Sequence, residues 1–554
     1  MEDTISLTMI VKNEAGNLKN CLDSVRGQVD EIVIVDTGST DNTPEIARNY
    51  TDKVYSYPWE GDFSAARNFA IDKANGAWIL TLDADEVLIP GTGDLKLLIA
   101  GENQIEAYLL PIDNPTAEAT GEANRYWVLR FFKNNGHYRF CGKIHEQIVV
   151  SETGVVGIAK GPIIKHKMLS TRERNRKRGR NLALLKKACA EDSRNYFLQY
   201  YLGVEWLMLG KPDRALPFLK MAYHNLTDDN FIFRGPALRY LVICLIALGK
   251  YDEAICLCLE ANLRYPEYTD IYYLGGVLFE EKKEYRLAVK WFNQALQCGT
   301  PPPLYNHMNG AGSFLACYHL GYCHEKLGQM ELARRYYERA LESNPSYIYP
   351  VYNLFGNLKA KHGPGHILEY FKEKGYLKLI NISLTTAELF FALGYPGMAR
   401  RCLEETKSKR TEEYTFSLGK YNIYSGRLQE GLEYLEMLPC ESNFYIQACK
   451  LRTLAMLLMG RFKAGRGLAL KLWKIPPARG YALVLIKLAC LMEKGGELVY
   501  PPKVRGVELL DLSLEILNQC SCYLPDRYPN QQKDLFFRLF TGMEKIIKGI
   551  SPRD

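Results

Sequence analysis

The stretch Trp78–Glu86, WILTLDADE, gives the clearest indication of the fold. Its first five residues are apolar or β-branched and predict a buried strand over Trp78–Leu82. The strand ends directly in Asp83-Ala84-Asp85, so that two carboxylates separated by one residue follow it. Such a pair on a tight turn supplies the hard oxygen ligands that Mg²⁺ or Mn²⁺ prefers. The plainer alternative is an acidic surface turn, and the surrounding strands favour the functional interpretation.

Three further strands precede this one and alternate with helical patterns. We expect strands at Leu7–Val11, Glu31–Asp36 and Val54–Tyr57, and a helix at Phe63–Ala74. The continuous apolar centre of EIVIVD, residues 31–36, is typical of a strand buried on both faces. Strands that alternate with helices predict an α/β domain with a parallel sheet. Ligands bind such sheets at the carboxyl ends of the strands, which is where the acidic pair lies.

Polar residues follow other strands at the same predicted edge. Val11, Lys12 and Glu14 form the loop after the first strand and are candidates for contacts with a nucleotide. Asp36 ends the second strand, where its carboxylate can accept the imide N–H of a uracil. Arg67 lies in the helix that follows, and its paired donors can reach a diphosphate. The plainer alternatives are a solvated helix start, a turn carboxylate and an exposed helical arginine.

A second cluster, Gly142-Lys143-Ile144-His145-Glu146, lies further along the chain. Glu146 is the best candidate for a general base, since a transfer to a protic acceptor needs a carboxylate or similar group that takes the acceptor proton. His145 either takes part directly or packs as a structural residue. His166 follows another apolar strand and either completes a metal shell as a nitrogen ligand or is an ordinary strand-end histidine.

A strongly basic segment separates this domain from the rest of the chain. Thr171–Arg180 (TRERNRKRGR) carries six basic residues and one acidic residue. We expect a basic helical linker over residues 169–192. Such a run is either a solvated helix face or a wall of the cleft that attracts phosphates or an acidic acceptor.

The second half of the sequence consists of internal helical repeats. Ala254 and Ala288 are 34 residues apart, the period of the tetratricopeptide repeat. Small residues at these positions allow the two helices of a unit to approach closely. We expect tetratricopeptide repeats over 193–350, and degenerate helical repeats with a C-terminal cap over 351–554. Four units contain alanine pairs seven residues apart: Ala215/Ala222, Ala254/Ala261, Ala288/Ala295 and Ala333/Ala340.

Composition excludes several classes of protein. The net charge of +7 on 554 residues is a mild excess that does not imply nucleic acid. The 15 cysteines include no CxxC and only two CxC pairs, Cys256/Cys258 and Cys520/Cys522, so we expect most of them to be reduced and buried. The start lacks a signal peptide, and the best apolar run, Tyr481–Met492, is short and carries Lys487. We therefore expect no transmembrane segment and a cytoplasmic location.

Several motifs in order resemble the family 2 glycosyltransferase domain with its GT-A fold. They are VKNEAGNLKNCLDSV, EIVIVDTGSTDNT, DFSAARNFA and WILTLDADE. Together with FCGKIHE, a later strand-end histidine and tetratricopeptide-like repeats, they are similar to the SunS-type bacterial peptide and protein glycosyltransferases. The resemblance covers about residues 5–190. It implies a GT-A, Rossmann-like nucleotide-sugar domain over 1–168, followed by an all-α tetratricopeptide-like solenoid.

The resemblance also implies an activity. It implies an inverting transfer from a UDP-sugar, helped by Mg²⁺ or Mn²⁺, by a hexosyl- or N-acetylhexosaminyl-transferase. Members that modify peptides use the repeat domain for acceptor binding or for dimerisation, so a homodimer is compatible with the sequence. The repeat region here is much longer, which fits a larger protein acceptor. Carried over by motif, the site residues are Asp36 at the base, Asp83 and Asp85 as the DxD with Asp85 on the metal, His166 near the metal, and Glu146 and His145 at the acceptor.

Other functions stay open at this point. The leading hypothesis is a peptide or protein glycosyltransferase that acts on a Ser/Thr oxygen or a Cys sulfur. The first alternative is a transferase of surface polysaccharide or lipid-linked glycan assembly, with the basic run docked on anionic lipid. The second is an interaction scaffold with an inactive first domain, against which the intact Asp83, Asp85 and Glu146 argue.

Overall fold

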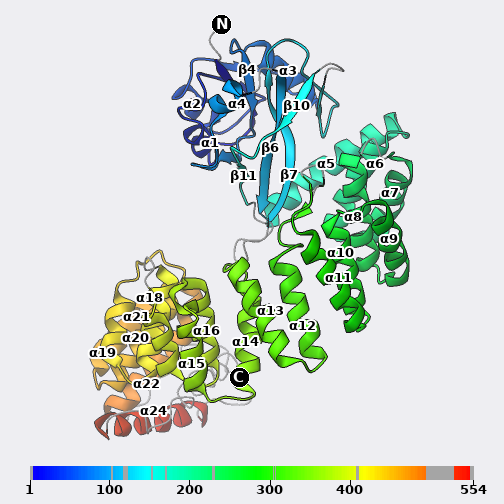
Figure 1. Ribbon diagram of the computed structural model, residues 1–554. Helices are drawn as coiled ribbons and strands as arrows, with labels where there is room; N and C mark the ends of the chain where they lie inside the picture. The colour runs from blue at the N-terminus through cyan, green and yellow to red at the C-terminus, as the bar shows by residue number, and fades with distance from the viewer. Residues whose placement is uncertain are drawn as a thin grey trace. The chain divides into compact units, whose positions relative to one another are not determined.

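The computed structural model describes residues 4–101, 104–115, 123–150, 154–168, 171–227, 231–302, 305, 307–406, 411–494 and 530–548. It divides into two compact units, Met1–Tyr347 and Ile348–Asp554 (Figure 1). The first unit contains the sheet and the first set of helices. In the second unit, every regular element within the described residues is a helix.

The first half of the sheet is parallel, as the sequence predicts. Its strands lie in the order β3-β2-β1-β4, and each neighbouring pair runs in the same direction. The helices α1, α2 and α3 connect these strands. The strands are buried because apolar residues occupy both faces, as in Leu7, Ile34 and Leu80. The bounds are β1 Ile5–Val11, α1 Leu18–Ser24, β2 Glu31–Asp36, α2 Thr43–Arg48, β3 Val54–Ser56, α3 Phe63–Asp72 and β4 Trp78–Thr81.

The second half of the sheet is mixed, which the sequence analysis does not foresee. Two long strands, β6 (Ile105–Pro115) and β7 (Ala123–Lys133), follow one another without a helix between them and therefore pair antiparallel. β7 also pairs antiparallel with β4, while β11 joins β6 to β5. The remaining elements are β5 Glu86–Leu88, α4 Leu95–Ala100, β8 Arg139–Cys141, β9 Gln147–Val149, β10 Val155–Ile158 and β11 Ile164–His166.

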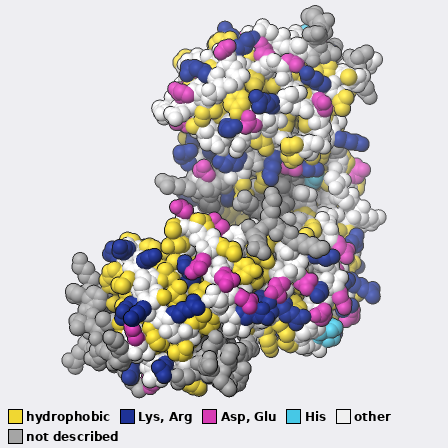
Figure 2. All heavy atoms as spheres, turned by 90° about the vertical axis from the view of Figure 1, so that its left-hand side faces the viewer, with side chains coloured by type: hydrophobic (Ala, Val, Ile, Leu, Met, Phe, Trp, Pro, Cys, Tyr) yellow, Lys and Arg dark blue, Asp and Glu magenta, His cyan; other side chains and the backbone are white. Residues whose placement is uncertain are grey.

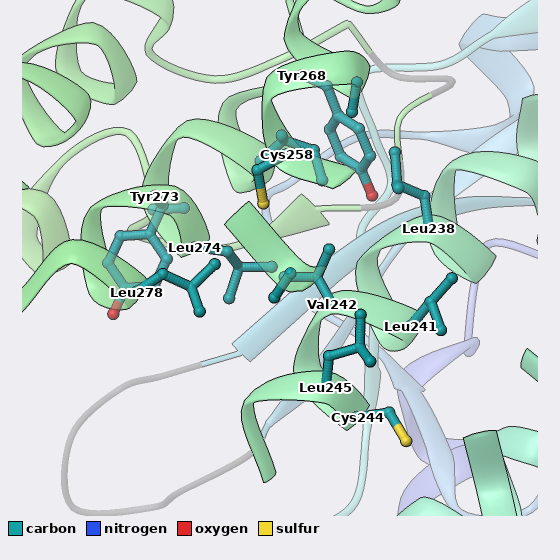
Figure 3. Packing of buried hydrophobic residues seen from close by; sticks show 14 of the residues in the cluster. Leu238, Leu241, Val242, Cys244, Leu245, Cys258, Tyr268, Tyr273, Leu274 and Leu278 are labelled. Atoms are coloured by element: carbon teal, nitrogen blue, oxygen red, sulfur yellow. The ribbon is translucent and has the colours of Figure 1, made fainter. Parts of the chain in front are cut away.

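Helical hairpins follow the sheet domain within the first unit and pack in sequence order (Figure 1). Figure 3 shows their core, in which Leu241 and Val242 of α8 pack with Cys258 of α9 and Leu274 of α10. The bounds are α5 Thr171–Glu191, α6 Tyr196–Met208, α7 Pro212–Asn225, α8 Phe231–Ala247, α9 Tyr251–Arg264, α10 Thr269–Glu281, α11 Tyr285–Cys298, α12 Phe314–Lys326 and α13 Met330–Ser343.

Glycines bring the two helices of a hairpin together. A Cβ atom on Gly321 of α12 would lie 2.6 Å from the ring of Tyr337 on α13, and one on Gly275 of α10 would lie 2.2 Å from Trp291 on α11. The same relation holds for two further pairs, and in all four the partner follows sixteen residues after the glycine. The other pairs are Gly203 with Leu219 and Gly419 with Leu435. The two helices of each of these hairpins therefore approach closely at a glycine.

An insertion between α11 and α12 ties the repeats to the sheet. Its short strand β12 (His307–Met308) pairs antiparallel with β7. The Met308 backbone N–H donates to the carboxylate of Asp270 on α10, at 2.9 Å. Asp270 also accepts from Arg239 of α8 at 3.0 Å, and both side chains are almost fully buried. The repeats and the sheet domain thus form one unit.

The second unit is a further series of helices. Leu539, Met543 and Ile546 of the last described helix lie in the same apolar cluster as Leu485 and Leu488. The apolar run Tyr481–Met492 is part of α22. The bounds are α14 Tyr349–Lys359, α15 Pro364–Glu373, η2 Tyr376–Lys378, α16 Ile380–Ala392, α17 Pro396–Glu404, α18 Glu412–Tyr424, α19 Leu428–Glu436, α20 Tyr445–Leu458, α21 Phe462–Trp473, η3 Pro476–Ala478, α22 Arg479–Lys494 and α24 Asn530–Lys548.

The surface agrees with the small net charge. In Figure 2, acidic and basic side chains are interspersed over the visible face. None of the helices in the described ranges is both long and apolar enough to cross a membrane. Cys256 and Cys258 are both free thiols, one exposed and one buried, while Cys520 and Cys522 lie outside the described residues.

Candidate functional site

The loops after β1 and β2 are joined into one rim at the carboxyl edge of the sheet. The Asn13 backbone N–H donates to Ser39 Oγ at 2.9 Å, and the Thr40 N–H donates to Asn13 Oδ1 at 2.7 Å. The Glu14 N–H donates to Thr43 Oγ1 at 2.8 Å. Asn13 adopts a positive φ of 56°, a conformation that asparagine tolerates better than most residues. The rim therefore holds Val11, Lys12 and Glu14 in fixed positions.

Asp36 makes turn contacts at the end of β2. Its carboxylate accepts from the Ser39 backbone N–H at 3.1 Å, from Ser39 Oγ at 2.5 Å and from the Gly38 N–H at 3.3 Å. The side chain is nearly buried. These bonds agree with the alternative in which Asp36 is a turn carboxylate. The contact of Asp36 with a uracil stays a prediction.

Arg67 of α3 connects the two predicted acidic motifs. Its Nη2 donates to Asp83 Oδ1 and its Nε to Glu146 Oε1, both at 2.6 Å. Its Nη1 lies 3.5 Å from Thr81 Oγ1. Arg67 is buried rather than exposed on the helix surface, and its nitrogens have protein partners. Arg67 thus bridges the carboxylates of Asp83 and Glu146. Its contact with a diphosphate, which the sequence suggests, remains a prediction.

A second buried arginine, Arg130 of β7, lies on the other side of Asp83. Its Nη2 lies 2.8 Å from Glu86 Oε1 and 3.6 Å from Asp83 Oδ2. Desolvation acts to raise the pKa of Asp83, but Arg67 and Arg130 outweigh it and hold that pKa well below its usual range. Burial raises the pKa of Glu86, although Arg130 opposes it. Asp83 is therefore an ionised carboxylate held between two guanidinium groups.

Glu146 is placed by a small hairpin. Strands β8 and β9 pair at Cys141 and Gln147, so residues 142–146 form the connecting loop. The N-terminal turn of α3 holds this loop, because Ser64 Oγ donates to the Gly142 carbonyl at 2.6 Å and the Phe63 N–H donates to the Lys143 carbonyl at 3.1 Å. The backbone of Gly142 has a φ of +98°, which favours glycine.

Asp85 and His166 are brought together by the pairing of β5 with β11. His166 is opposite Glu86 in this ladder, and the Lys167 N–H donates to the Asp85 carbonyl at 2.7 Å. His166 Nε2 consequently lies 3.6 Å from Asp85 Oδ2. Lys177 of helix α5 approaches the same oxygen, with its Nζ at 2.5 Å. At least one basic side chain of the predicted linker, that of Lys177, therefore contacts the site.

Two cavities meet at these residues. The first, which we call the strand-end cavity, has a volume of about 260 Å³ and is lined by Val11, Lys12, Glu14, Asp85, His166, Lys177 and Arg180, among others. The second, the aromatic cavity, measures about 620 Å³ and is lined by Tyr126, Trp127, Tyr200, Tyr201, Phe233 and Tyr240, among others. Both cavities share the four residues Arg67, Asp83, His145 and Glu146.

His145 lies at this junction in an unusual conformation. Its φ is +51°, and its ring stacks on Tyr201 of α6 at a centroid distance of 3.7 Å and an angle of 9°. Burial lowers the pKa of His145 to about 4, so the imidazole is neutral at physiological pH. Its Nε2 is buried without a hydrogen-bond partner among the described residues.

The structure thus assembles most of the predicted site residues and adds others. Sequence reasoning missed Arg130, Glu86 and the aromatic residues of the repeats. Arg130 carries a signal in retrospect, because it is a lone charge inside the apolar strand YWVLRFF. The aromatic residues carry none, because their role depends on how α6 and α8 pack beside the sheet domain.

Comparisons with known proteins agree with this arrangement. Residues 6–140 match the family model Glycosyl transferase family 2, and residues 314–347 match Tetratricopeptide repeat. These two matches fall on the α/β domain with its strand-end site and on the adjoining helical solenoid, and together they indicate a glycosyltransferase with tetratricopeptide repeats. The chain carries a family 2 glycosyltransferase domain, and as an enzyme it is a glycosyltransferase.

Individual relatives cover different parts of the chain. A TPR repeat-containing protein of Synechococcus elongatus is 28% identical over 63% of this chain and 68% of its own length. The SPbeta prophage-derived glycosyltransferase SunS of Bacillus subtilis is 27% identical over 50% of this chain and 66% of its own. The lipopolysaccharide core biosynthesis glycosyltransferase LpsC of Rhizobium meliloti is 30% identical over 29% of this chain and 62% of its own length. The chain thus spans about two thirds of the length of these relatives.

Proposed function

We propose that this glycosyltransferase moves a sugar from a UDP-sugar to a peptide or protein acceptor, with inversion at the anomeric carbon. The observation that supports this most is the meeting of two cavities at Arg67, Asp83, His145 and Glu146. A transferase must hold donor and acceptor on opposite sides of the reacting carbon. The similarity to SunS, which is named a glycosyltransferase, supports the same class of reaction.

In this proposal the strand-end cavity binds the donor. The rim residues Val11, Lys12 and Glu14 and the carboxylate of Asp36 lie where ligands bind an open α/β sheet, at the carboxyl ends of the strands. Lys177 and Arg180 of α5 supply positive charge beside the cavity, which suits the diphosphate of a nucleotide-sugar. The sugar would extend from the diphosphate towards the junction.

In this proposal two protein ligands and the donor hold the divalent cation, since the described residues contain no cluster of three or more His, Cys, Asp or Glu side chains that could hold a metal alone. Asp85 offers a buried carboxylate and His166 an imidazole nitrogen 3.6 Å from it, and a positive charge, the Lys177 ammonium, already lies against that carboxylate. Oxygen and nitrogen ligands completed by substrate phosphates suit Mg²⁺ or Mn²⁺. Such an ion would neutralise the departing diphosphate. Asp83 is engaged with Arg67 and Arg130, so we assign the metal to Asp85 and His166.

Glu146 acts as the general base in this proposal. Its Oε1 accepts from Arg67, while among the described residues no donor contacts Oε2, which leaves that oxygen for the acceptor. The acceptor oxygen or sulfur forms a bond to the anomeric carbon, the bond from that carbon to the diphosphate breaks, and the acceptor proton passes to Glu146. Arg67 donates to both Glu146 and Asp83 and so fixes the position of the Glu146 carboxylate at the junction of the two cavities.

The aromatic cavity binds the acceptor in this proposal. Its walls come from β7 and from the repeat helices α6 and α8, and they offer stacking surfaces for a peptide side chain. A second candidate function, assembly of a surface polysaccharide or lipid-linked glycan, is supported by the likeness to LpsC, because aromatic rings also stack on sugars.

Nucleotide release from a panel of sugar nucleotides, with and without Mn²⁺, tests the proposal. We expect slow, metal-dependent release of UDP from one donor without any acceptor. Adding a pool of Ser-, Thr- and Cys-containing peptides should then yield a product heavier by one sugar in mass spectrometry. If only lipid-linked or polysaccharide acceptors are modified, the second candidate is correct. If no sugar nucleotide binds or reacts, the transferase proposal is wrong.

A further inference from the structure

We propose that Lys177 is a built-in counter-cation that occupies the metal position on Asp85 in the donor-free enzyme and leaves it when the metal and the donor bind together. Lys177 belongs to helix α5, which follows the sheet domain in the chain. Its Nζ lies 2.5 Å from Asp85 Oδ2. The release of Lys177 towards the donor phosphates rests on the proposed function. The competition requires only that Asp85 binds the metal, whether or not a sugar is transferred.

Asp85 is the carboxylate of the Asp83-Ala84-Asp85 pair that no arginine holds among the described residues. Asp83 is held by Arg67 at 2.6 Å and faces Arg130 at 3.6 Å. Glu146 is held by Arg67. Asp85 is only 6% exposed, and the groups that approach its Oδ2 are His166 and Lys177.

The Lys177 ammonium and a divalent cation cannot share Asp85 Oδ2. A Mg²⁺–oxygen bond is roughly 2.1 Å long, so an ion on Oδ2 would stand within a few ångströms of Nζ. Two like charges at such a distance repel each other strongly in a partly buried site. Metal binding to the donor-free protein therefore requires that Lys177 withdraws, and this requirement weakens the binding.

The Lys177 side chain can move from Asp85 to another partner in the strand-end cavity. Its side chain is 35% exposed and lies on a flexible four-carbon stem. It lines the strand-end cavity together with Arg180 of the same helix. A diphosphate in that cavity brings new negative charge, which offers the ammonium another partner while the metal takes Asp85. Metal and donor should therefore bind cooperatively.

Mn²⁺ binding to the full-length, donor-free protein tests this inference by calorimetry or by the electron paramagnetic resonance of free Mn²⁺. Lys177→Met and Lys177→Gln should each raise the affinity for Mn²⁺ at least about tenfold. Lys177→Arg keeps the charge and should retain the weak binding of the wild type. Lys187→Met, an exposed lysine on the same helix, is the matched control and should change nothing.

Two further variants assign the site. Adding Asp85→Asn to Lys177→Met should abolish the gained affinity. Unaltered Mn²⁺ affinity in both Lys177→Met and Lys177→Gln, with native circular dichroism, overturns the inference. If that happens while the wild type releases UDP from a sugar nucleotide, the proposed function stands without it. If the variants gain affinity but no sugar nucleotide is ever turned over, the counter-cation role stands and the proposed function fails.

Discussion

The strand-end cavity and the aromatic cavity share four residues but differ in chemistry. One aromatic side chain, Phe63, lines the strand-end cavity, whose other side chains include Lys12, Asp85 and Lys177. Seven aromatic side chains line the other cavity. Charged groups suit a nucleotide diphosphate and its metal, whereas aromatic faces suit an acceptor that is recognised by shape and stacking. In the proposed function, a single sheet edge serves two ligands because the repeats complete the wall of the second cavity.

Asp85→Asn should have the largest effect, because it removes the carboxylate of the strand-end cavity that we assign to the metal. We expect the release of UDP from a sugar nucleotide to fall on the order of a thousandfold, since the metal supplies several kcal/mol of stabilisation to the leaving group. Asp52→Asn, at an exposed position, is the control. Unchanged turnover in Asp85→Asn would refute the metal assignment.

Glu146→Gln probes the junction itself. We expect sugar transfer to a peptide pool to fall on the order of a hundredfold, because an amide cannot accept the proton. The affinity for UDP should stay close to that of the wild type in calorimetry, since the amide oxygen still accepts from Arg67. A large loss of UDP binding would instead place Glu146 on the donor side.

Phe233→Ala probes the aromatic cavity alone. Phe233 lines this cavity and packs edge-to-face on Phe197 at 4.6 Å. Its removal should raise the KM for the acceptor about tenfold, because burying an aromatic side chain contributes about 1.5–3 kcal/mol. Acceptor-independent UDP release should not change. Tyr352→Ala, at an exposed tyrosine, is the control, and an equal loss of donor turnover in Phe233→Ala would contradict the division between the cavities.

Gly321→Ala tests the solenoid that forms one wall of the aromatic cavity. The added methyl group would lie 2.6 Å from the buried ring of Tyr337, so we expect a loss of about 1–3 kcal/mol in the free energy of unfolding. Gly356 lies on a helix, and a Cβ added there would have no atom within 4 Å. Gly356→Ala should therefore raise the free energy of unfolding by up to about 1 kcal/mol. Chemical denaturation measures both, and equal effects would refute the packing argument.

The effect of His145→Asn should appear in the pH dependence of stability. Burial lowers the pKa of His145 from 6.5 to about 4, so the unfolded state binds more protons between these values. Stability therefore rises with pH across this window and is lost as the pH falls through it. Asparagine tolerates the positive φ at this position. The melting temperature of the variant should therefore change less with pH over this window than that of the wild type. The exposed His137→Asn is the control, and a matching flattening there would argue against His145.

Local patterns were enough to predict the first four strands, their parallel direction and the helical repeats, but not the order of the strands in the sheet. Continuous apolar runs such as residues 31–36 form strands wherever a sheet is covered on both faces. The antiparallel β6–β7 pair and the strand β12 were not predictable, because pairing between distant segments leaves no local period. Within the site, Asp83, Asp85, Glu146 and His166 are at strand ends or in a short loop, where a motif is visible in sequence.

The partners of these residues could not be predicted in the same way. The position of Arg67 between two carboxylates depends on how α3 packs against the β8–β9 hairpin. The contact of Lys177 with Asp85 depends on how α5 lies beside the strand ends. Both are tertiary facts that charge patterns in the sequence leave open, since a basic run is compatible with a solvated face or with a cleft wall.

A crystal structure of the full-length protein with UDP and Mn²⁺ tests the central claim most directly. We expect UDP in the strand-end cavity, with its diphosphate and the metal facing Asp85, Lys177 withdrawn from that carboxylate, and the aromatic cavity open towards Glu146. UDP bound in the aromatic cavity, or a metal held away from Asp85, would contradict the division of the site into a donor side and an acceptor side.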